Sequence, residues 1–282
     1  MLESLMTPFT AKKRPWEMFF IGLFYYCVAC VLSIWVFREY ASIVVLLLTI
    51  IAIVPLIYRT IILEERTAIE PGPYLSVLIG HLKYFSSVMY LFGGIVLACA
   101  LWYVFAPASM VQDLFAAQIK TIAGISITGH ATNSLSLFIK IFYNNIKVLI
   151  FCIIFSCIYG SGAIFILTWN ASVIGAAIGY YIRTKLAVIS SYTGWDYMVS
   201  YFGTFSIGLL KYVIHGIPEI LAYFIGGLAG GIISVGIMKK EFISSRKFPN
   251  LLWDASNLII IAIVITFIAA ILEVYVTPMV FR

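Results

Sequence analysis

Charge is what this sequence has least of. Only 11% of its 282 residues are Asp, Glu, Lys or Arg, whereas a soluble domain carries roughly 25%. Hydrophobic residues make up 63% of the chain, and its mean hydropathy is +1.06. This shortage of charge excludes an ordinary soluble domain and predicts an integral membrane protein.

The sequence also lacks the short motifs of several common enzyme classes. It has no Gly-x-Ser-x-Gly element, no Walker loop, no dinucleotide fingerprint and no His-Glu-x-x-His pair. We therefore expect no cofactor and no enzyme of these classes, while an unusual intramembrane enzyme stays open.

Metal ligands are few and scattered. A metal site needs three or four ligands, but only three histidines are present, and His81 and His130 fall in predicted loops distant from His215. All five cysteines lie inside predicted spans. Cys27-x-x-Cys30 has apolar neighbours, so apolar packing is favoured over a redox or metal pair. The sequence thus predicts no metal site.

Uncharged runs of spanning length recur along the chain, and roughly 20 apolar residues cross a bilayer as a helix. Backbone groups cannot stay unpaired in lipid, and no alternation of polarity suggests a barrel, so the spans should be helices. We predict an all-α polytopic membrane protein with six or seven crossings. The number is six if residues 170–215 are re-entrant or interfacial, and seven otherwise. The runs are Met18–Phe37, Ala41–Tyr58, Ser86–Met110, Val148–Ile182 (long enough to fold back), Ile220–Met238 and Asn257–Leu272.

The first 70 residues are predicted to form a basic segment and a transmembrane hairpin that turns at residues 38–40. A polar loop over 59–83 follows, and its breaker Pro71-Gly72-Pro73 predicts a boundary between residues 1–70 and a membrane domain over 71–282. The first span is too long for a secretory signal peptide and lacks a small-x-small cleavage site, so we expect it to remain as an anchor.

The net charge of +6 comes from short basic clusters beside the spans, at residues 12–14 and 239–247. This arrangement is typical of the positive-inside rule and of contact with anionic head groups, not of nucleic-acid binding. We expect a multi-pass protein of the cell membrane with a cytoplasmic N-terminus.

Residues Val111–Ile125 differ in kind from the spans. Apolar residues recur there at helical spacing, with Gln112, Asp113 and Gln118 between them. The pattern predicts an amphipathic helix, which lies either in the membrane interface or against other helices outside the membrane. Small polar residues over Gly124–Ser136 predict a loop or hinge after it.

The stretch 215–219, His-Gly-Ile-Pro-Glu, places an imidazole and a carboxylate beside an uncharged run. Ionisable groups at membrane depth are costly, so they are usually paired and often functional. Pro218 removes a backbone donor and disfavours helix before it, so the helix should be broken or kinked between Ile214 and Pro218. If it breaks, a new helix can begin at Pro218 with Glu219 in its first turn. Helix capping, proton transfer by the His–carboxylate pair and a transporter-like binding site all stay open.

Further polar residues lie at the edges of the predicted spans. Asn144 and Asn145 should cap the span that follows them, and Asn170 should lie in a tight turn that ends it. Glu273 is either solvated at the interface or partnered inside the bundle. We expect several of these side chains to form one buried network that joins helices. The candidate network comprises His215, Gly216, Pro218, Glu219, Asn144, Asn145, Asn170 and Glu273.

Glycines recur at Gly-x-x-x-Gly spacing in two places, which lets helix backbones approach closely. Packing within one chain is the simpler interpretation, and a seam in a homo-oligomer is the alternative. The residues are Gly175, Gly179, Gly226, Gly227, Gly230 and Gly231.

Four segments, in their order and spacing, resemble the stage II sporulation protein M family. They are Phe138–Asn145, Trp169–Ser172, His215–Glu219 and Leu272–Pro278. They correspond to the family's Asn-containing start of a hydrophobic helix, its Asn-Gly-like turn, its His-Gly-x-Pro-Glu element and its final Glu-x-x-x-Thr-Pro. The resemblance extends over residues 75–280. The turn here has Ala171 in place of Gly, and residues 1–70 lie outside the core motifs.

The resemblance implies a non-enzymatic membrane scaffold or complex subunit. In spore formers the named protein recruits wall-degrading partners during engulfment, but the family also occurs in bacteria and archaea that make no spores, so sporulation is not implied. Expected partners are the lipid bilayer and other membrane or envelope proteins. The alternatives are a small transporter or permease component with a polar site at His215–Glu219, and an intramembrane enzyme.

Overall fold

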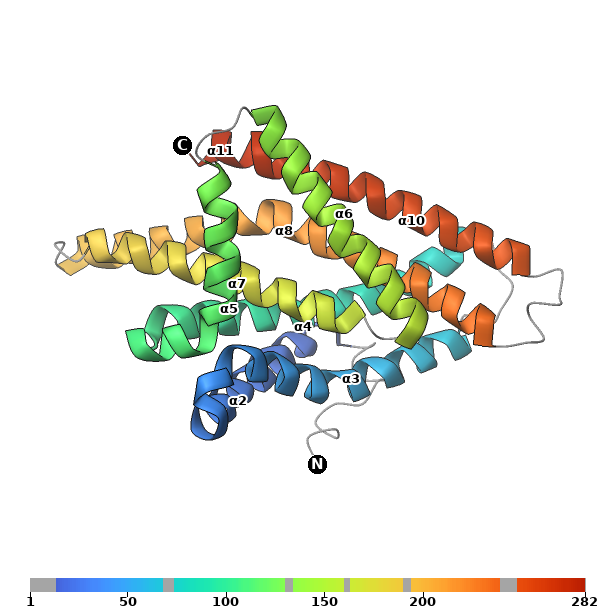
Figure 1. Cartoon of the computed structure of the whole chain (residues 1–282), viewed down its shortest axis with the longest axis horizontal. Coiled ribbons are helices and arrows are strands. Elements are labelled where there is room, and N and C mark those ends of the chain that lie inside the picture. Colours follow the sequence, from blue (N-terminus) through green and yellow to red (C-terminus); the bar gives the residue numbers. More distant parts are fainter. Residues whose placement is uncertain are drawn as a thin grey trace. The chain divides into compact units, whose positions relative to one another are not determined.

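The structure, a computed structural model, describes residues 14–67, 74–129, 134–159, 163–189, 194–238 and 248–281. Within these ranges every regular element is a helix and no strand occurs, which confirms the predicted all-α class (Figure 1). The elements are α2 (Glu17–Phe37), η2 (Arg38–Tyr40), α3 (Ala41–Thr67), α4 (Tyr74–Phe105), α5 (Ala108–Gly129), α6 (Ser134–Tyr159), α7 (Ala163–Ile189), α8 (Gly194–Met238), α10 (Phe248–Ile271), η3 (Leu272–Val276) and α11 (Thr277–Val280).

Six segments of the described chain are long and apolar enough to cross a membrane, judged by length and composition. The first, Glu17–Ile57, contains both α2 and α3, which the short 3₁₀ turn η2 joins where the hairpin was predicted. The other five lie in α4, α6, α7, α8 and the α10–α11 region. The chain is therefore a multi-pass helical membrane protein, as its composition predicts.

Two predicted loops are shorter than the sequence indicated. Helix α3 continues to Thr67 and α4 begins at Tyr74, so most of the expected 59–83 loop is helical. Likewise, α5 extends to Gly129 and α6 begins at Ser134. In α3 the polar residues Glu64, Glu65 and Arg66 end an apolar run without ending the helix, because straight-chain polar residues have good helix propensity. His130 lies outside the described residues.

The helix does not break at Pro218, whereas a kink there stays a prediction. Helix α8 runs without interruption from Gly194 to Met238, and Pro218 lies inside it. The proline nitrogen carries no hydrogen, so the bond to the carbonyl of Ile214 is missing by covalent structure. Helices in membranes tolerate this loss because neighbouring helices and local adjustments compensate for it.

The predicted turn at Asn170 is also wrong, since α7 passes through it from Ala163 to Ile189. The long run 148–182 does divide into two helices, but the division falls between Tyr159 and Ala163. The sequence between these two residues is Gly-Ser-Gly and lies outside the described residues. Asn144 and Asn145 lie well inside α6, so neither caps its start.

Packing divides the chain into two compact units. The boundary predicted between residues 70 and 71 lies outside the described residues. The first unit is Met1–Ile122 with Thr168–Arg183, and the second is Ala123–Leu167 with Thr184–Arg282.

In the first unit, glycines bring α2 and α4 into close contact. A side-chain carbon at Gly22 would clash with the backbone oxygen of Leu91, and one at Gly94 would clash with the backbone oxygen of Phe19. Helix α5 carries the predicted apolar face, with Leu114 and Phe115 fully buried. That helix therefore packs within the first unit. Gln118, which the sequence placed on the polar face of the helix, is buried instead.

The second unit is built on α6, α8 and α10, which pack against one another. Helix α6 (yellow-green) and α10 (red) lie beside the orange α8 (Figure 1). The π-helical turn η3, which continues α10, packs against both α6 and α8. This junction of three helices brings together most of the candidate network.

Candidate functional site

The candidate site lies in the second unit, where α8 meets η3 and α11. Helix α8 presents His215, Glu219 and Tyr223 at four-residue intervals, so the three side chains share one face. The opposing elements contribute Glu273 from η3 and Thr277 from the start of α11. Two segments far apart in the sequence thus supply one polar cluster.

Glu219 and Tyr223 form the tightest contact of this cluster. The Tyr223 hydroxyl donates to Glu219 Oε1 at 2.6 Å, and Tyr223 is completely buried. A short bond from a neutral donor to a carboxylate oxygen is stronger than one between neutral groups. Because Tyr223 lies one turn after Glu219, this bond holds the carboxyl group against its own helix.

Glu273 interacts electrostatically with both Glu219 and Tyr223 across the junction. Both glutamates are only partly exposed, and neither forms an ion pair with a described residue. Two like charges so placed would repel. The junction therefore brings together two carboxyl groups, with one tyrosine hydroxyl bound to the first.

His215 contacts the other end of the same junction. Its Nδ1 lies 3.4 Å from Thr277 Oγ1, and that hydroxyl donates its single hydrogen to the carbonyl of Leu272 at 2.8 Å. The threonine oxygen is thus left to accept, which makes the Nδ1–H tautomer the matching donor. At 3.4 Å this is a weak bond, but it joins α8 to α11 directly.

Glu273 and Thr277 lie at a turn with π-helical geometry. The backbone N–H of Thr277 bonds to the carbonyl of Leu272, five residues earlier, and the side chain of Thr277 bonds to the same oxygen. Such bulges are frequent at functional sites because they redirect side chains. Hydropathy alone could not reveal the bulge.

The two adjacent asparagines of α6 have different environments. Asn145 is buried, with a 5% exposed fraction, on the stripe that continues through Leu149 and Cys152. Cys152 interacts electrostatically with Tyr223, so this stripe faces the cluster on α8. Asn144 is exposed, about 100° around the helix from Asn145. Only one of the pair therefore belongs to the packed face.

Asn170 lies on α7 in the first unit, outside the group of residues that the second unit brings together. One residue of that helix, Ser172, is joined to α4 and α5 by hydrogen bonds. Cys99 Sγ donates to the carbonyl of Ser172 at 3.1 Å, and Gln118 Nε2 donates to the Ser172 hydroxyl at 3.2 Å. Polar contacts between helices therefore occur in both units.

The glycines predicted to pack helices do face other helices of the same chain. A side-chain carbon at Gly175 would lie 2.7 Å from the backbone oxygen of Val96, and Gly179 faces Tyr103. In the second unit, Gly226 faces Leu149, and Gly227 faces Ala163. Gly230 faces the backbone of Ile153. Gly216 is buried in α8, and Pro218 is partly buried there. Gly231, also partly buried, directly follows Gly230 on the same helix.

Aromatic contacts tie the first resembling segment to the last. The ring of Phe138 lies 6.3 Å from that of Tyr275 and 5.4 Å from that of Phe267. Phe142 also meets Phe267, edge to face at 5.6 Å. Three of the four segments, on α6, α8 and η3–α11, are thus assembled within one unit.

Sequence reasoning missed several residues of this arrangement. Tyr223 had a signal, since a residue four positions after Glu219 lies above it on a helix. Arg183 had none: its Nη1 donates to the carbonyls of Tyr103 and Ala106, both at 3.0 Å, and so caps the end of α4. In the described part of the chain, no group of three or more His, Cys, Asp or Glu residues could hold a metal ion.

The sequence was also compared with models of known protein families. The family described as stage II sporulation protein M matches residues 86–278, which is more than half of the chain. The chain belongs to the stage II sporulation protein M family. The matched range contains all four segments named above, and it leaves α2 and α3 outside. Comparisons with curated proteins and with solved structures found no match.

Proposed function

We propose that this member of the stage II sporulation protein M family is a non-enzymatic membrane scaffold that organises partner membrane or envelope proteins. One observation carries the proposal. Two polar residues of the family motif are bonded within their own unit: Glu219 to Tyr223 of the same helix, and His215 to Thr277 at the start of α11. The contact of His215 with Thr277 fixes the position of α8 relative to α11, which is what a rigid platform for partners requires.

The test is the substitution Glu219→Gln, with Glu39→Gln as a matched control. Glu39 is an exposed carboxylate on η2. A neutral amide at 219 keeps the shape but loses the charged acceptor of the Tyr223 bond, which costs about 1–3 kcal/mol in a dry site. For a scaffold, we expect lower thermal stability in detergent and less partner recovered from native membranes. The control should change neither.

A transport role is the second candidate, and the proximity of Glu219 to Glu273 favours it. Acidic and histidine side chains inside helical bundles often form proton relays. In that case, Glu273→Gln would abolish flux in proteoliposomes while stability and partner recovery stay normal. That pattern would reject the scaffold and make this cluster an active site.

We also propose that the N-terminus is cytoplasmic in the cell membrane, because the basic residues 12–14 precede the first span. Reporter fusions at the N-terminus test this orientation. An active periplasmic or external reporter there would refute it.

A further inference from the structure

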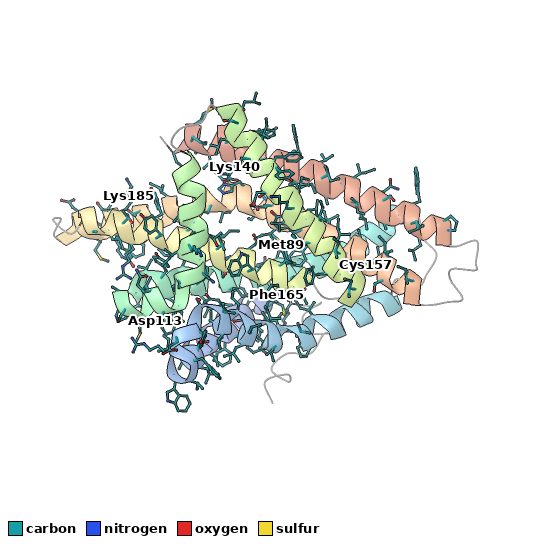
Figure 2. All side chains as sticks on the ribbon, in the orientation of Figure 1. Met89, Asp113, Lys140, Cys157, Phe165 and Lys185 are labelled. Atoms are coloured by element: carbon teal, nitrogen blue, oxygen red, sulfur yellow. The ribbon has the colours of Figure 1, made fainter. Side chains whose placement is uncertain are left out.

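A polar stripe runs along the exposed side of α6. Lys140, Tyr143, Asn144 and Lys147 follow one another at spacings of three and four residues, so they lie on one face of the helix. All four are exposed, and the Lys147 ammonium lies 4.4 Å from the centre of the Tyr143 ring. Figure 2 marks Lys140 in the first half of α6 and Cys157 near its end.

The depth of this stripe is unusual. Lys147 lies near the middle of the Ser134–Tyr159 helix, about 18–20 Å from either end at ~1.5 Å per residue. Helix α6 is one of the six candidate spans, and the hydrocarbon core is about 30 Å thick. If α6 crosses fully, Lys147 lies near the midplane. Long basic side chains escape to the interface only near helix ends.

Charged residues inside spans almost always face a bundle interior or a water-filled cavity. Here the packed side of α6 is already used, because Gly226 and Gly230 of α8 meet Leu149 and Ile153 there. Helix α6 is also the least buried of the six candidate spans. A lysine that faces outward at this depth therefore marks a surface that another molecule covers.

We infer that this face of α6 binds a transmembrane helix of another protein that carries an Asp or Glu at mid-depth. This inference rests on the proposed scaffold function and states the chemistry of the partner. The carboxylate would lie against Lys147 and accept a hydrogen bond from Asn144. The apolar part of the partner would cover Phe151, Ile154 and Ile158, which continue the same exposed face.

Charge and depth favour an acidic partner helix over a second copy of the chain and over a lipid head group. In a symmetric pair of copies in one membrane, each α6 face would meet its own equivalent at the same depth, so Lys147 would oppose Lys147. Phosphate head groups lie about 15 Å from the midplane, half the thickness of the hydrocarbon core. A carboxylate on a partner helix is the group that can reach this depth.

The experiment uses the full chain in phosphatidylcholine vesicles with synthetic Leu–Ala transmembrane peptides. One peptide carries a central Glu, and its controls carry Gln or Leu at that position. Energy transfer from the tryptophans of the chain to a dansyl group on the peptide reports binding. We expect the Glu peptide to bind at least about tenfold more tightly than the Leu peptide. Lys147→Leu should abolish this preference.

The matched control is Lys185→Leu, because Lys185 is an exposed lysine near the end of α7 (Figure 2). This variant should keep the preference, and both variants should melt at the wild-type temperature. Lys147→Glu should prefer a peptide with a central Lys. Equal binding of the Glu and Leu peptides, or full binding by Lys147→Leu, would overturn the inference.

Two further results would also overturn it by naming another occupant. Loss of peptide binding when phosphatidylglycerol is added would assign the face to anionic lipid. Self-association of the chain that Lys147→Leu abolishes would assign it to a second copy. The experiments separate a failure of the proposed surface from a failure of the proposed scaffold function. If Lys147→Leu still recovers partners from native membranes, only the proposed surface is refuted. If the chain binds peptides by charge but recovers no partner, only the scaffold function is refuted.

Discussion

Three glycines on α8 provide a graded test of how tightly this helix is packed. Gly203, Gly226 and Gly230 all lie in one continuous helix, so the same change to alanine has the same intrinsic effect on the backbone. What differs is the space that each added methyl group would enter. At Gly203 it meets nothing within 4 Å, whereas at Gly230 it meets the backbone oxygen of Ile153 and, at 3.0 Å, the Ser156 Cβ.

These environments predict opposite signs. Gly203→Ala should stabilise the chain by about 0.4–1 kcal/mol, because alanine restricts the unfolded state without a steric cost in the folded one. Gly230→Ala gains the same amount but overpacks a contact, which costs about 1–3 kcal/mol. Backbone cannot rotate away, so the upper end of that range applies and a net loss of about 2 kcal/mol follows.

Gly226→Ala should fall between the two. The atom it meets is the terminal Cδ1 of Leu149, and a flexible side chain can change rotamer at a cost of order 0.5–1.5 kcal/mol. The net effect should therefore be within about 1 kcal/mol of zero.

Thermal unfolding of the three purified variants in one detergent, followed by far-ultraviolet circular dichroism, measures this order. At about 2–4 °C per kcal/mol, Gly203→Ala should melt a few degrees above the wild type and Gly230→Ala several degrees below it. Equal melting temperatures for Gly203→Ala and Gly230→Ala would refute the packing of α6 on α8.

Three further substitutions test individual hydrogen bonds by the same melting assay. Tyr223→Phe should cost about 1–3 kcal/mol by removing the donor to a buried carboxylate, whereas Tyr275→Phe, whose hydroxyl bonds no described residue, should be nearly neutral; equal effects would contradict the cluster. Arg183→Gln should cost about 1.5–3 kcal/mol because it uncaps α4, and the exposed control Lys185→Gln should stay within about 0.5 kcal/mol. Gln118→Leu should change stability by less than about 1 kcal/mol, because the loss of the Nε2 bond to Ser172 is offset by the removal of an amide oxygen that is buried without a partner; a loss above about 3 kcal/mol would show that this oxygen is satisfied.

Much of the architecture follows from the sequence alone. Membrane spans depend on the summed hydropathy of about 20 neighbouring residues, which is a local property. The hairpin at Arg38–Tyr40 is likewise local, because a short charged stretch separates two apolar runs. The family motifs are also read along the chain, and they placed His215, Glu219 and Glu273 among the candidates before any contact was known.

Helix continuity could not be predicted in the same way. Local propensity favoured breaks at Pro218 and Asn170, and both helices continue through these residues. A missing backbone bond or a weak helix former costs a few kcal/mol at most, and packing along a long apolar helix outweighs that cost. The outcome thus depends on neighbours that lie elsewhere in the sequence.

Only the tertiary structure decided which polar groups meet. The contact of His215 with Thr277 joins residues 62 positions apart, and the contact of Arg183 with the end of α4 spans 80 positions. The π-helical turn that carries Glu273 leaves no mark in hydropathy. The sequence determines which segments are apolar and which side chains are polar. Side-chain packing between helices determines which of those polar groups become partners, because that pairing depends on distance in space rather than along the chain.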